Sequence, residues 1–242
     1  MRAAFGRALD LVFPPQTLDG AAPPLSSGLS AEAWARVQFI AEPFCDGCGV
    51  PFEYDVGGRC AACLARPRAF ARARAACLYD DASRDLILKF KHADRTDLAR
   101  LFTRWVGRAA ADLLAEADAV APVPMHATRL LARRYNQAAE VARPLARAHR
   151  IAYLPDALIR SRRTPSQAGK SGSGRRRNVA GAFAVPPARR ARVEGRRIVL
   201  IDDVLTTGAT LEACAKVLLA AGARSVDVAV VARVREAANI SI

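Results

Sequence analysis

Two adjacent carboxylates and a hydroxyl-rich turn stand together near the end of this 242-residue sequence. Asp202 and Asp203 follow the apolar run 198–201, whose length and β-branched content predict a buried parallel strand. The Thr-Thr-Gly-Ala-Thr turn 206–210 comes next, before a helical pattern over 211–221 that Gly222 would end. Backbone N–H groups at a helix N-terminus attract anions, and carboxylates accept hydrogen bonds from hydroxyl groups. The stretch therefore predicts a site for a sugar phosphate.

The turn has the groups that a phosphate needs, because its threonines offer hydroxyls and Gly208 lets the backbone approach closely. The residues expected at the phosphate are Thr206, Thr207, Gly208, Ala209 and Thr210. Asp202 and Asp203 are expected at the sugar hydroxyls or at a metal-bound water. The alternative is an ordinary strand–turn–helix unit with a polar turn. The ordered combination of strand, acidic pair and turn favours the ligand site.

A second chemical site is indicated by two Cys-x-x-Cys pairs that eleven residues separate. The four cysteines are Cys45, Cys48, Cys60 and Cys63. Two such pairs supply the tetrahedral thiolate shell of a structural Zn²⁺ ion, with an iron–sulfur cluster and a metal-free site as alternatives. Four protein ligands leave no open position, so we expect no catalytic role for this metal. Cys77 and Cys214 lie in apolar contexts and are expected to be buried.

Strands alternate with helices along the rest of the chain, which predicts an α/β fold with a twisted, mostly parallel sheet flanked by helices. The predicted strands are 75–79, 118–123, 198–201 and 225–232. The predicted helices are 31–37 with Ser30 as N-cap, 83–91, 97–114, 211–221 and one that ends at His149. We expect the tail from Arg233 to be frayed. Ligands of such sheets bind at the carboxyl ends of the strands, where the turn 206–210 and the loop after 118–123 can converge.

Basic segments precede two of these elements. Residues 124–137 form a basic loop between a strand and a helix, which is an anion-binding layout, although a lone His126 is more often a surface or capping residue. Residues 162–178 are rich in Gly, Ser and Arg, and predict either a lid over the site or a disordered linker. Lys91 stands at a joint between two predicted helices, where a lysine is often simply solvated.

The net charge of +14 has two readings. A polyanion such as nucleic acid could be a partner, or the arginines could reflect a GC-rich genome. No apolar run is long enough to cross a membrane, and residues 1–13 lack a small-residue cleavage site. We therefore expect a cytoplasmic protein without a membrane span.

The stretch 199–210 resembles the phosphoribosyl-pyrophosphate (PRPP) motif of type I phosphoribosyltransferases. Over residues 42–232 the chain resembles the ComF family of competence-associated proteins, in which a four-cysteine zinc ribbon precedes a phosphoribosyltransferase-like domain. The resemblance implies a helix and linker segment at 1–41, a zinc ribbon at 42–70 and a phosphoribosyltransferase-like domain at 71–242. The chain departs from the family in lacking a cysteine pair after Phe13-Pro14-Pro15, and in having Ala93 where relatives tend to have glycine.

The resemblance also implies roles for individual residues. Asp202 and Asp203 would be catalytic and contact the ribose, and the turn 206–210 would hold the 5-phosphate. The residues expected at pyrophosphate are His126, Arg129, Arg134, Asn136 and Gln137. Those expected in the flexible loop are Arg162, Ser166, Gln167, Arg175 and Asn178, and Lys91 is expected to face the ligand.

Two functions stay open at this point. One is Mg²⁺-dependent transfer of a phosphoribosyl group from PRPP, or a related sugar phosphate, to an acceptor. The other is a non-catalytic PRPP sensor or single-stranded-DNA-binding accessory protein. The family is linked to uptake of transforming DNA, which implies DNA and DNA-uptake proteins as partners.

Overall fold

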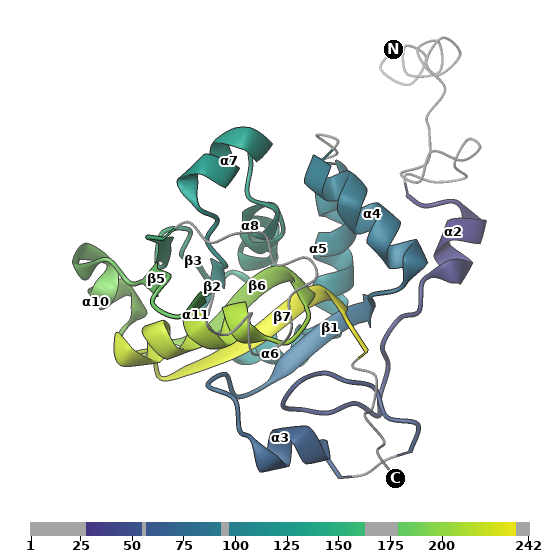
Figure 1. Cartoon of the computed structure of the whole chain (residues 1–242), viewed down its shortest axis with the longest axis horizontal. Helices are drawn as coiled ribbons and strands as arrows, with labels where there is room; N and C mark the ends of the chain where they lie inside the picture. Colours follow the sequence, from purple (N-terminus) through teal and green to yellow (C-terminus); the bar gives the residue numbers. More distant parts are fainter. Residues whose placement is uncertain (1–27, 55–56, 93–96, 163–178, 236–242) are drawn as a thin grey trace.

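A five-stranded parallel sheet lies at the centre of the computed structural model, which describes residues 28–54, 57–92, 97–162 and 179–235 (Figure 1). Its strands run in the order β1-β7-β6-β2-β3, and every neighbouring pair is parallel. The strands are β1 (Ala73–Leu78), β2 (Ala119–Pro122), β3 (Ala152–Tyr153), β6 (Arg197–Leu205) and β7 (Ser225–Arg233). A separate antiparallel pair consists of β4 (Ile159–Arg160) and β5 (Phe183–Ala184).

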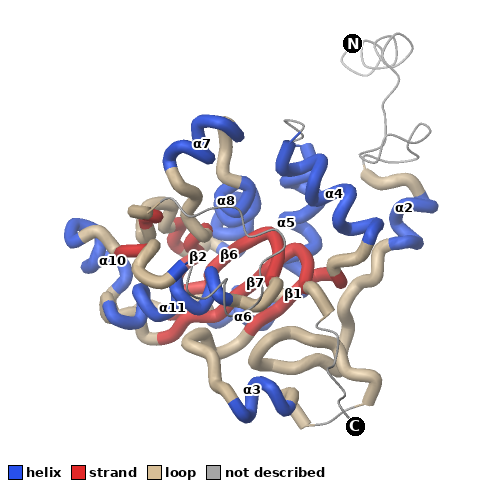
Figure 2. Tube along the Cα trace, viewed as in Figure 1, coloured by secondary structure: helices blue, strands red, loops and turns tan. Residues whose placement is uncertain are grey.

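Helices cover both faces of the sheet (Figure 2). Side chains alternate along β6, so Val199 and Ile201 face one core while Ile198 and Leu200 face the other. The first core is completed by α4 (Asp81–His92), α5 (Asp97–Ala109), α6 (Ala111–Glu116) and α8 (Gln137–His149). The second is completed by α11 (Ala209–Ala220), α10 (Arg190–Val193) and β5. A 3-10 turn at Pro187–Arg189 precedes α10. A sheet buried on both faces explains why its strands read as continuous apolar runs.

Residues 38–40 lie along the edge of the sheet at β1. Leu78 N donates to Gln38 O at 2.8 Å and Ile40 N donates to Ala76 O at 3.0 Å, so this segment covers the exposed edge of β1. It follows α2 (Ala31–Arg36), where Ser30 Oγ accepts from Ala33 N at 3.1 Å, as the N-cap prediction required. The cysteine-bearing segment, with α3 (Ala61–Ala65), lies below β1 in Figure 1.

The α/β class and the parallel sheet are confirmed, with four corrections to the detail. β6 extends to Leu205, so the acidic pair lies within the strand and not after it. The predicted helix 97–114 is two helices, because Ala110 leaves helical geometry at φ −112° and ψ 25°. The predicted basic loop contains a helix, α7 (Ala127–Arg133), which projects at the top of Figure 1. Arg233 is the last residue of β7 and only 1% exposed, so the expectation of a tail frayed from this position was wrong.

The predicted domain boundaries at residues 41 and 70 stay predictions. Across the boundary at residue 70, the described part of the cysteine-bearing segment is closely joined to the sheet. Arg74 of β1 donates to Asp46 Oδ1 and to Asp112 Oδ2, both at 2.7 Å, and its guanidinium stacks on Phe44 at 4.8 Å. Among the described helices none has the length and apolar character that a membrane crossing requires.

Candidate functional site

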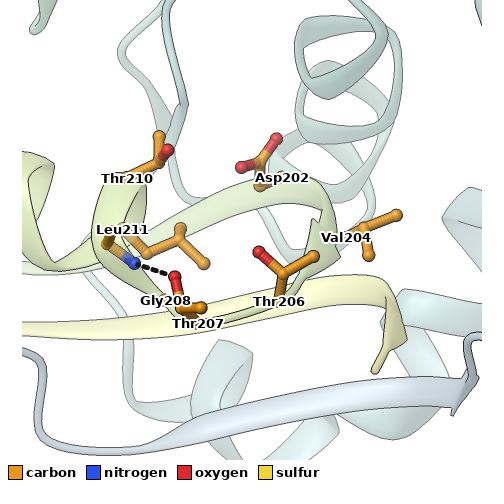
Figure 3. Close-up of a pocket in the computed structure, with 8 residues that line it drawn as sticks. Asp202, Val204, Thr206, Thr207, Gly208, Thr210 and Leu211 are labelled. Atoms are coloured by element: carbon orange, nitrogen blue, oxygen red, sulfur yellow. Dashed lines mark hydrogen bonds between the residues drawn. The ribbon is translucent and has the colours of Figure 1, made fainter. Parts of the chain in front are cut away.

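The turn between β6 and α11 encloses a small hollow of about 30 Å³ (Figure 3). Asp202, Val204 and the residues from Thr206 to Leu211 line it. Gly208 adopts the left-handed conformation at φ 78° directly before the first residue of α11, a conformation that other residues rarely take. The hydroxyl of Thr207 faces the Ala209 amide at 3.5 Å. The turn thus brings hydroxyl groups to the N-terminus of a twelve-residue helix, where an anion is favoured.

Asp202 and Asp203 lie just before this turn and have different environments. Both are partly buried, and Asp203 N donates to Asp202 Oδ1 at 2.9 Å. Asp203 Oδ2 lies 2.6 Å from Lys91 Nζ, in an ion pair whose side chains are each about one-fifth exposed (19% and 20%). Burial, followed by the negative charge of Asp203, raises the pKa of Asp202 to about 7. Two neighbouring carboxylates with such different surroundings are typical of a functional site.

Lys91 reaches the acidic pair because several elements fix the end of α4. Phe90 is 1% exposed and packs edge-on against Phe102, with ring centroids 5.2 Å apart. The hydroxyl of Tyr135, between α7 and α8, donates to Phe90 O. The backbone next to Lys91 is therefore held by residues from two other parts of the sequence. Lys91 is therefore paired with the acidic pair, and is not simply a solvated surface lysine.

Three arginines add positive charge beside the acidic pair. Burial lowers the pKa of Arg133, while the charge of Asp203 raises it and that of Arg129 lowers it. Arg160 shows the same pattern, with burial and Arg129 lowering its pKa and Asp202 raising it. Arg133 and Arg160 keep their protons despite these effects, since an arginine side chain does not deprotonate in proteins. A cluster of mutually repelling, partly desolvated cations favours an anionic ligand.

The residues expected at pyrophosphate lie in different surroundings and do not form one cluster of ligand-facing side chains. Arg129 lies within electrostatic range of Arg133 and Arg160. His126 is the N-cap of α7, where Nδ1 accepts from Thr128 N at 3.3 Å, so the capping alternative describes it. Arg134 ends α7 in the left-handed conformation at φ 64° and is exposed.

The other two expected residues bind the protein itself. Asn136 donates to Val123 O at 3.0 Å and caps α8 by accepting from Ala138 N at 3.1 Å, which ties the helix to the end of β2. Gln137 is 2% exposed, and its Oε1 accepts from Arg133 Nη1 at 3.4 Å. Within the described ranges Gln137 Nε2 has no hydrogen-bond partner.

Of the residues expected in the flexible loop, Ser166, Gln167, Arg175 and Asn178 lie outside the described ranges. Arg162 is described and donates to Ala180 O at 2.8 Å. Arg133 and Arg160 were not among the site residues expected from the sequence. Arg133 had a signal, since it adjoins the noted Arg134, whereas Arg160 became visible only when β4 placed it near Asp202.

The four predicted cysteines form one cluster, with all their sulfur atoms within 4.8 Å of one another. Cys48 Sγ and Cys60 Sγ are 3.8 Å apart. A tetrahedral zinc with metal–sulfur bonds of about 2.3 Å requires sulfur separations of about 3.8 Å, so the cluster fits such a metal. In addition, Cys60 N lies 3.2 Å from Cys45 Sγ, and a backbone donor suits a thiolate.

A buried cation accompanies the cysteine cluster. Burial raises the pKa of Cys48, and the positive charge of Arg233 acts in the opposite direction. In the described part of the chain Arg233 Nε and Nη1 have no hydrogen-bond partner, although the side chain is only 1% exposed. Four thiolates around a divalent ion carry a net negative charge, which this guanidinium would offset. The donor set and its surroundings therefore fit a structural metal such as zinc.

Comparison with known proteins identifies relatives over most of the chain. Residues 99–239 match the family described as the phosphoribosyl transferase domain. Competence protein F of Haemophilus influenzae is 30% identical over 196 residues, which cover 79% of this chain and 85% of that protein. DNA utilization protein YhgH of Escherichia coli (strain K12) is 30% identical over 200 residues, which cover 80% of this chain and 86% of that protein.

A solved structure is also similar to this chain. It is glutamine phosphoribosylpyrophosphate (PRPP) amidotransferase from B. subtilis, complexed with ADP and GMP, with a sequence identity of 24% and a TM-score of 0.37. The match covers 58% of this chain and 30% of that longer chain.

The cysteine cluster predicts one zinc ion per purified chain. Replacing Cys45 or Cys60 by serine should release it and increase the protease sensitivity of residues 42–70, because the tetrahedral shell is broken. Elemental analysis of the purified proteins measures the metal. Cys214→Ala is the matched control, because this buried cysteine lies in a separate core and its loss should leave the zinc content unchanged. Finding iron, or no metal, in the wild-type protein would contradict the prediction.

The environment of Asp202 predicts a pH-dependent stability. Its folded-state pKa lies above the ordinary value of 3.8, so its contribution to stability falls as the pH rises from about 4 to about 7. The stability advantage of Asp202→Asn over wild type should therefore grow by about 1–3 kcal/mol between pH 5 and pH 8. Urea unfolding at the two pH values measures this difference.

Asp203→Asn is a second variant for this experiment, because the charge of Asp203 is the other cause of the raised pKa of Asp202. It removes the partner of Lys91 and should destabilise the protein at pH 8. A constant difference between Asp202→Asn and wild type at both pH values would show that burial does not perturb Asp202.

Proposed function

Because the chain belongs to the ComF family and carries its phosphoribosyl transferase domain, we propose that it binds PRPP at the turn between β6 and α11. The observation that carries the proposal is that an acidic pair and a phosphate-type turn follow one another along one stretch of backbone. The acidic pair ends the buried part of β6, and the hydroxyl- and glycine-bearing turn opens α11. A phosphate bonded to a sugar has this arrangement of charge, with an anion beside a set of hydroxyl donors.

Each end of the ligand has matching groups in this proposal. The 5-phosphate accepts hydrogen bonds from the threonine hydroxyls and backbone amides at the N-terminus of α11. The ribose hydroxyls donate to Asp202 and Asp203, while carboxylates at that position would repel a phosphate. Lys91 neutralises part of the charge of the pair, so that two carboxylates can lie side by side beside an anionic ligand.

We further propose that the bound PRPP reacts by transfer of its phosphoribosyl group to an acceptor. The bond between C1 of the ribose and pyrophosphate breaks, positive charge develops on the ribose, and the acceptor bonds to C1. We assign Arg129, Arg133 and Arg160, whose charges act on one side of the acidic pair, to the departing pyrophosphate, and the carboxylates to the cationic ribose. Mg²⁺, bound through the ligand's oxygen atoms, would supply further charge neutralisation.

A role in DNA use is the second function proposed. Two relatives are named for competence and for DNA utilization, and the net charge of +14 favours a polyanion. Single-stranded DNA is the partner that we propose. Segment 162–178, which has six basic residues and no acidic one, is the candidate contact by sequence, and it lies mostly outside the described ranges.

The PRPP proposal predicts separable effects at the two ends of the ligand. With Mg²⁺ present, Asp202→Asn combined with Asp203→Asn should weaken PRPP much more than inorganic phosphate, because phosphate makes no ribose contact. Thr207→Val should weaken both by about 1–3 kcal/mol through loss of a charge-assisted hydrogen bond. Titration calorimetry measures both affinities.

Two control variants accompany these measurements. Asp85→Asn removes a carboxylate from the exposed face of α4, and Thr103→Val removes a hydroxyl that bonds Ala99 O within α5. Neither should change the affinity for PRPP. Unchanged affinity in the double aspartate variant would sink the assignment of the ribose site. Release of pyrophosphate in the presence of candidate acceptors separates a transferase from a protein that only binds PRPP.

The DNA proposal predicts a strong salt dependence. Affinity for single-stranded DNA should fall steeply as salt rises, because each phosphate contact releases counterions. Neutralising Arg162, Arg163 and Arg175 should lower both the affinity and the slope of its logarithm against the logarithm of salt concentration. Neutralising Arg189 and Arg192, which pair with Asp156 from the 3-10 turn and from α10, is the control. No binding at low salt would remove DNA as a direct partner.

A further inference from the structure

Arg68 lies against the outer side of the turn that we assign to the 5-phosphate. Its Nη1 donates to Thr207 O at 2.8 Å, across 139 residues of sequence. Arg68 is not among the residues that line the hollow, whereas Thr207 and Gly208 are. The guanidinium therefore contacts the turn from outside the hollow.

The guanidinium of Arg68 lies directly against the backbone of Gly208. A Cβ atom added at Gly208 would lie 2.5 Å from Arg68 Nη1 and 3.4 Å from Arg68 Cζ. Arg68 would have to shift to admit that atom, and Gly208 also has a φ of 78°, a conformation that strains any residue with a side chain. The guanidinium thus occupies the space that a side chain at the turn would fill.

This hydrogen bond fixes the direction of an amide that the ligand would use. In a planar trans peptide the C=O and N–H bonds point in opposite directions. Because Arg68 holds the carbonyl of Thr207 on its own side, the N–H of Gly208 in the same peptide points to the other side of the turn. A rotated peptide would present a carbonyl oxygen to a phosphate, which repels it.

Arg68 is itself held between two structured parts. Its guanidinium lies 5.7 Å from the ring centroid of Phe70, which is 2% exposed in the core beside α11. On the other side, Cys63 of the metal-binding cluster is five residues before Arg68, and Arg66 N still donates to Ala62 O of α3 at 3.1 Å. The position of the guanidinium therefore depends on both the core and the cysteine cluster.

We propose that Arg68 is a positioning residue for the phosphate-binding turn, and that through it the affinity for a phosphorylated sugar depends on an intact metal site. This inference rests on the proposed function. It gives the cysteine module a role in ligand binding that does not require any of its residues to touch the ligand.

The test measures the affinity of the full-length, metal-loaded protein for ribose 5-phosphate and PRPP. Arg68→Gln should lower both affinities about tenfold or more, since a hydrogen bond from a charged donor is lost and the peptide is released. Arg68→Lys should retain part of the affinity, because it keeps the charge but not the fork of donors. Arg59→Gln is the matched control, since Arg59 belongs to the same module and donates to Ala71 O at 3.1 Å, away from the turn.

Metal removal provides the readout that a merely structural residue would not give. Chelation should lower the affinity of the wild-type protein for ribose 5-phosphate to the level of Arg68→Gln, and should have little further effect on that variant. Chelation could instead lower the affinity of the wild-type protein and of Arg68→Gln by the same factor, while the melting temperature of each protein stays unchanged. That result would overturn the coupling between the metal site and the turn. Wild-type affinity in Arg68→Gln would overturn the positioning role and leave the proposed function intact. Absence of binding by the wild-type protein to both ligands would instead refute the proposed function and, with it, this inference.

Discussion

The ion pair between Lys91 and Asp203 is the interaction on which the rest of the site depends. Two consecutive carboxylates in a buried strand repel each other, and burial together with the charge of Asp203 raises the pKa of Asp202. The pair lowers this electrostatic cost only if Lys91 is brought to within 2.6 Å, and that requires the end of α4 to be fixed over the sheet. The hydrogen bond from Tyr135 to Phe90 O and the packing of Phe90 fix it. The acidic pair, α4 and the turn before α8 are therefore parts of one electrostatic arrangement, although they lie far apart in the sequence.

Part of the net positive charge of the chain is concentrated beside the acidic pair. Arg129, Arg133 and Arg160 come from α7 and β4, and Arg129 lies close enough to the other two to lower the pKa of each. Folding holds these like charges together beside two carboxylates, of which Asp203 is already paired with Lys91. An anionic ligand with several phosphates would relieve the repulsion, which is the electrostatic basis for assigning pyrophosphate to this side of the site. The general excess of arginine elsewhere needs no such explanation.

The cysteine module is joined to the sheet through arginines as well as through the backbone. Arg74 ties Asp46 to α6, Arg233 lies buried beside Cys48, and Arg68 holds the Thr207 carbonyl. Each places a guanidinium where a carboxylate, a thiolate cluster or a carbonyl needs a donor, a task for which its planar set of N–H groups is suited. A small segment can in this way be fixed against a larger domain. The same contacts give a route by which loss of the metal would reach the phosphate-binding turn.

The sequence alone determined the features that are local in the chain. The apolar run, the acidic pair, the threonine–glycine turn and the four cysteines have a required order and spacing, so the parallel sheet, the turn at α11 and the cysteine cluster could be predicted from them. The helix α7 was missed because its start depends on a histidine cap, a weak signal, and its end on a left-handed Arg134. Only the tertiary structure decided which charges meet: that Lys91 pairs with Asp203, that Asn136 turns to the backbone, and that Arg68, Arg160 and Arg233 reach the two sites. The physical reason is that Coulomb forces and hydrogen bonds act between atoms a few ångströms apart in space. The number of residues between two side chains does not give that spatial distance, which is set when the sheet brings its strand ends together.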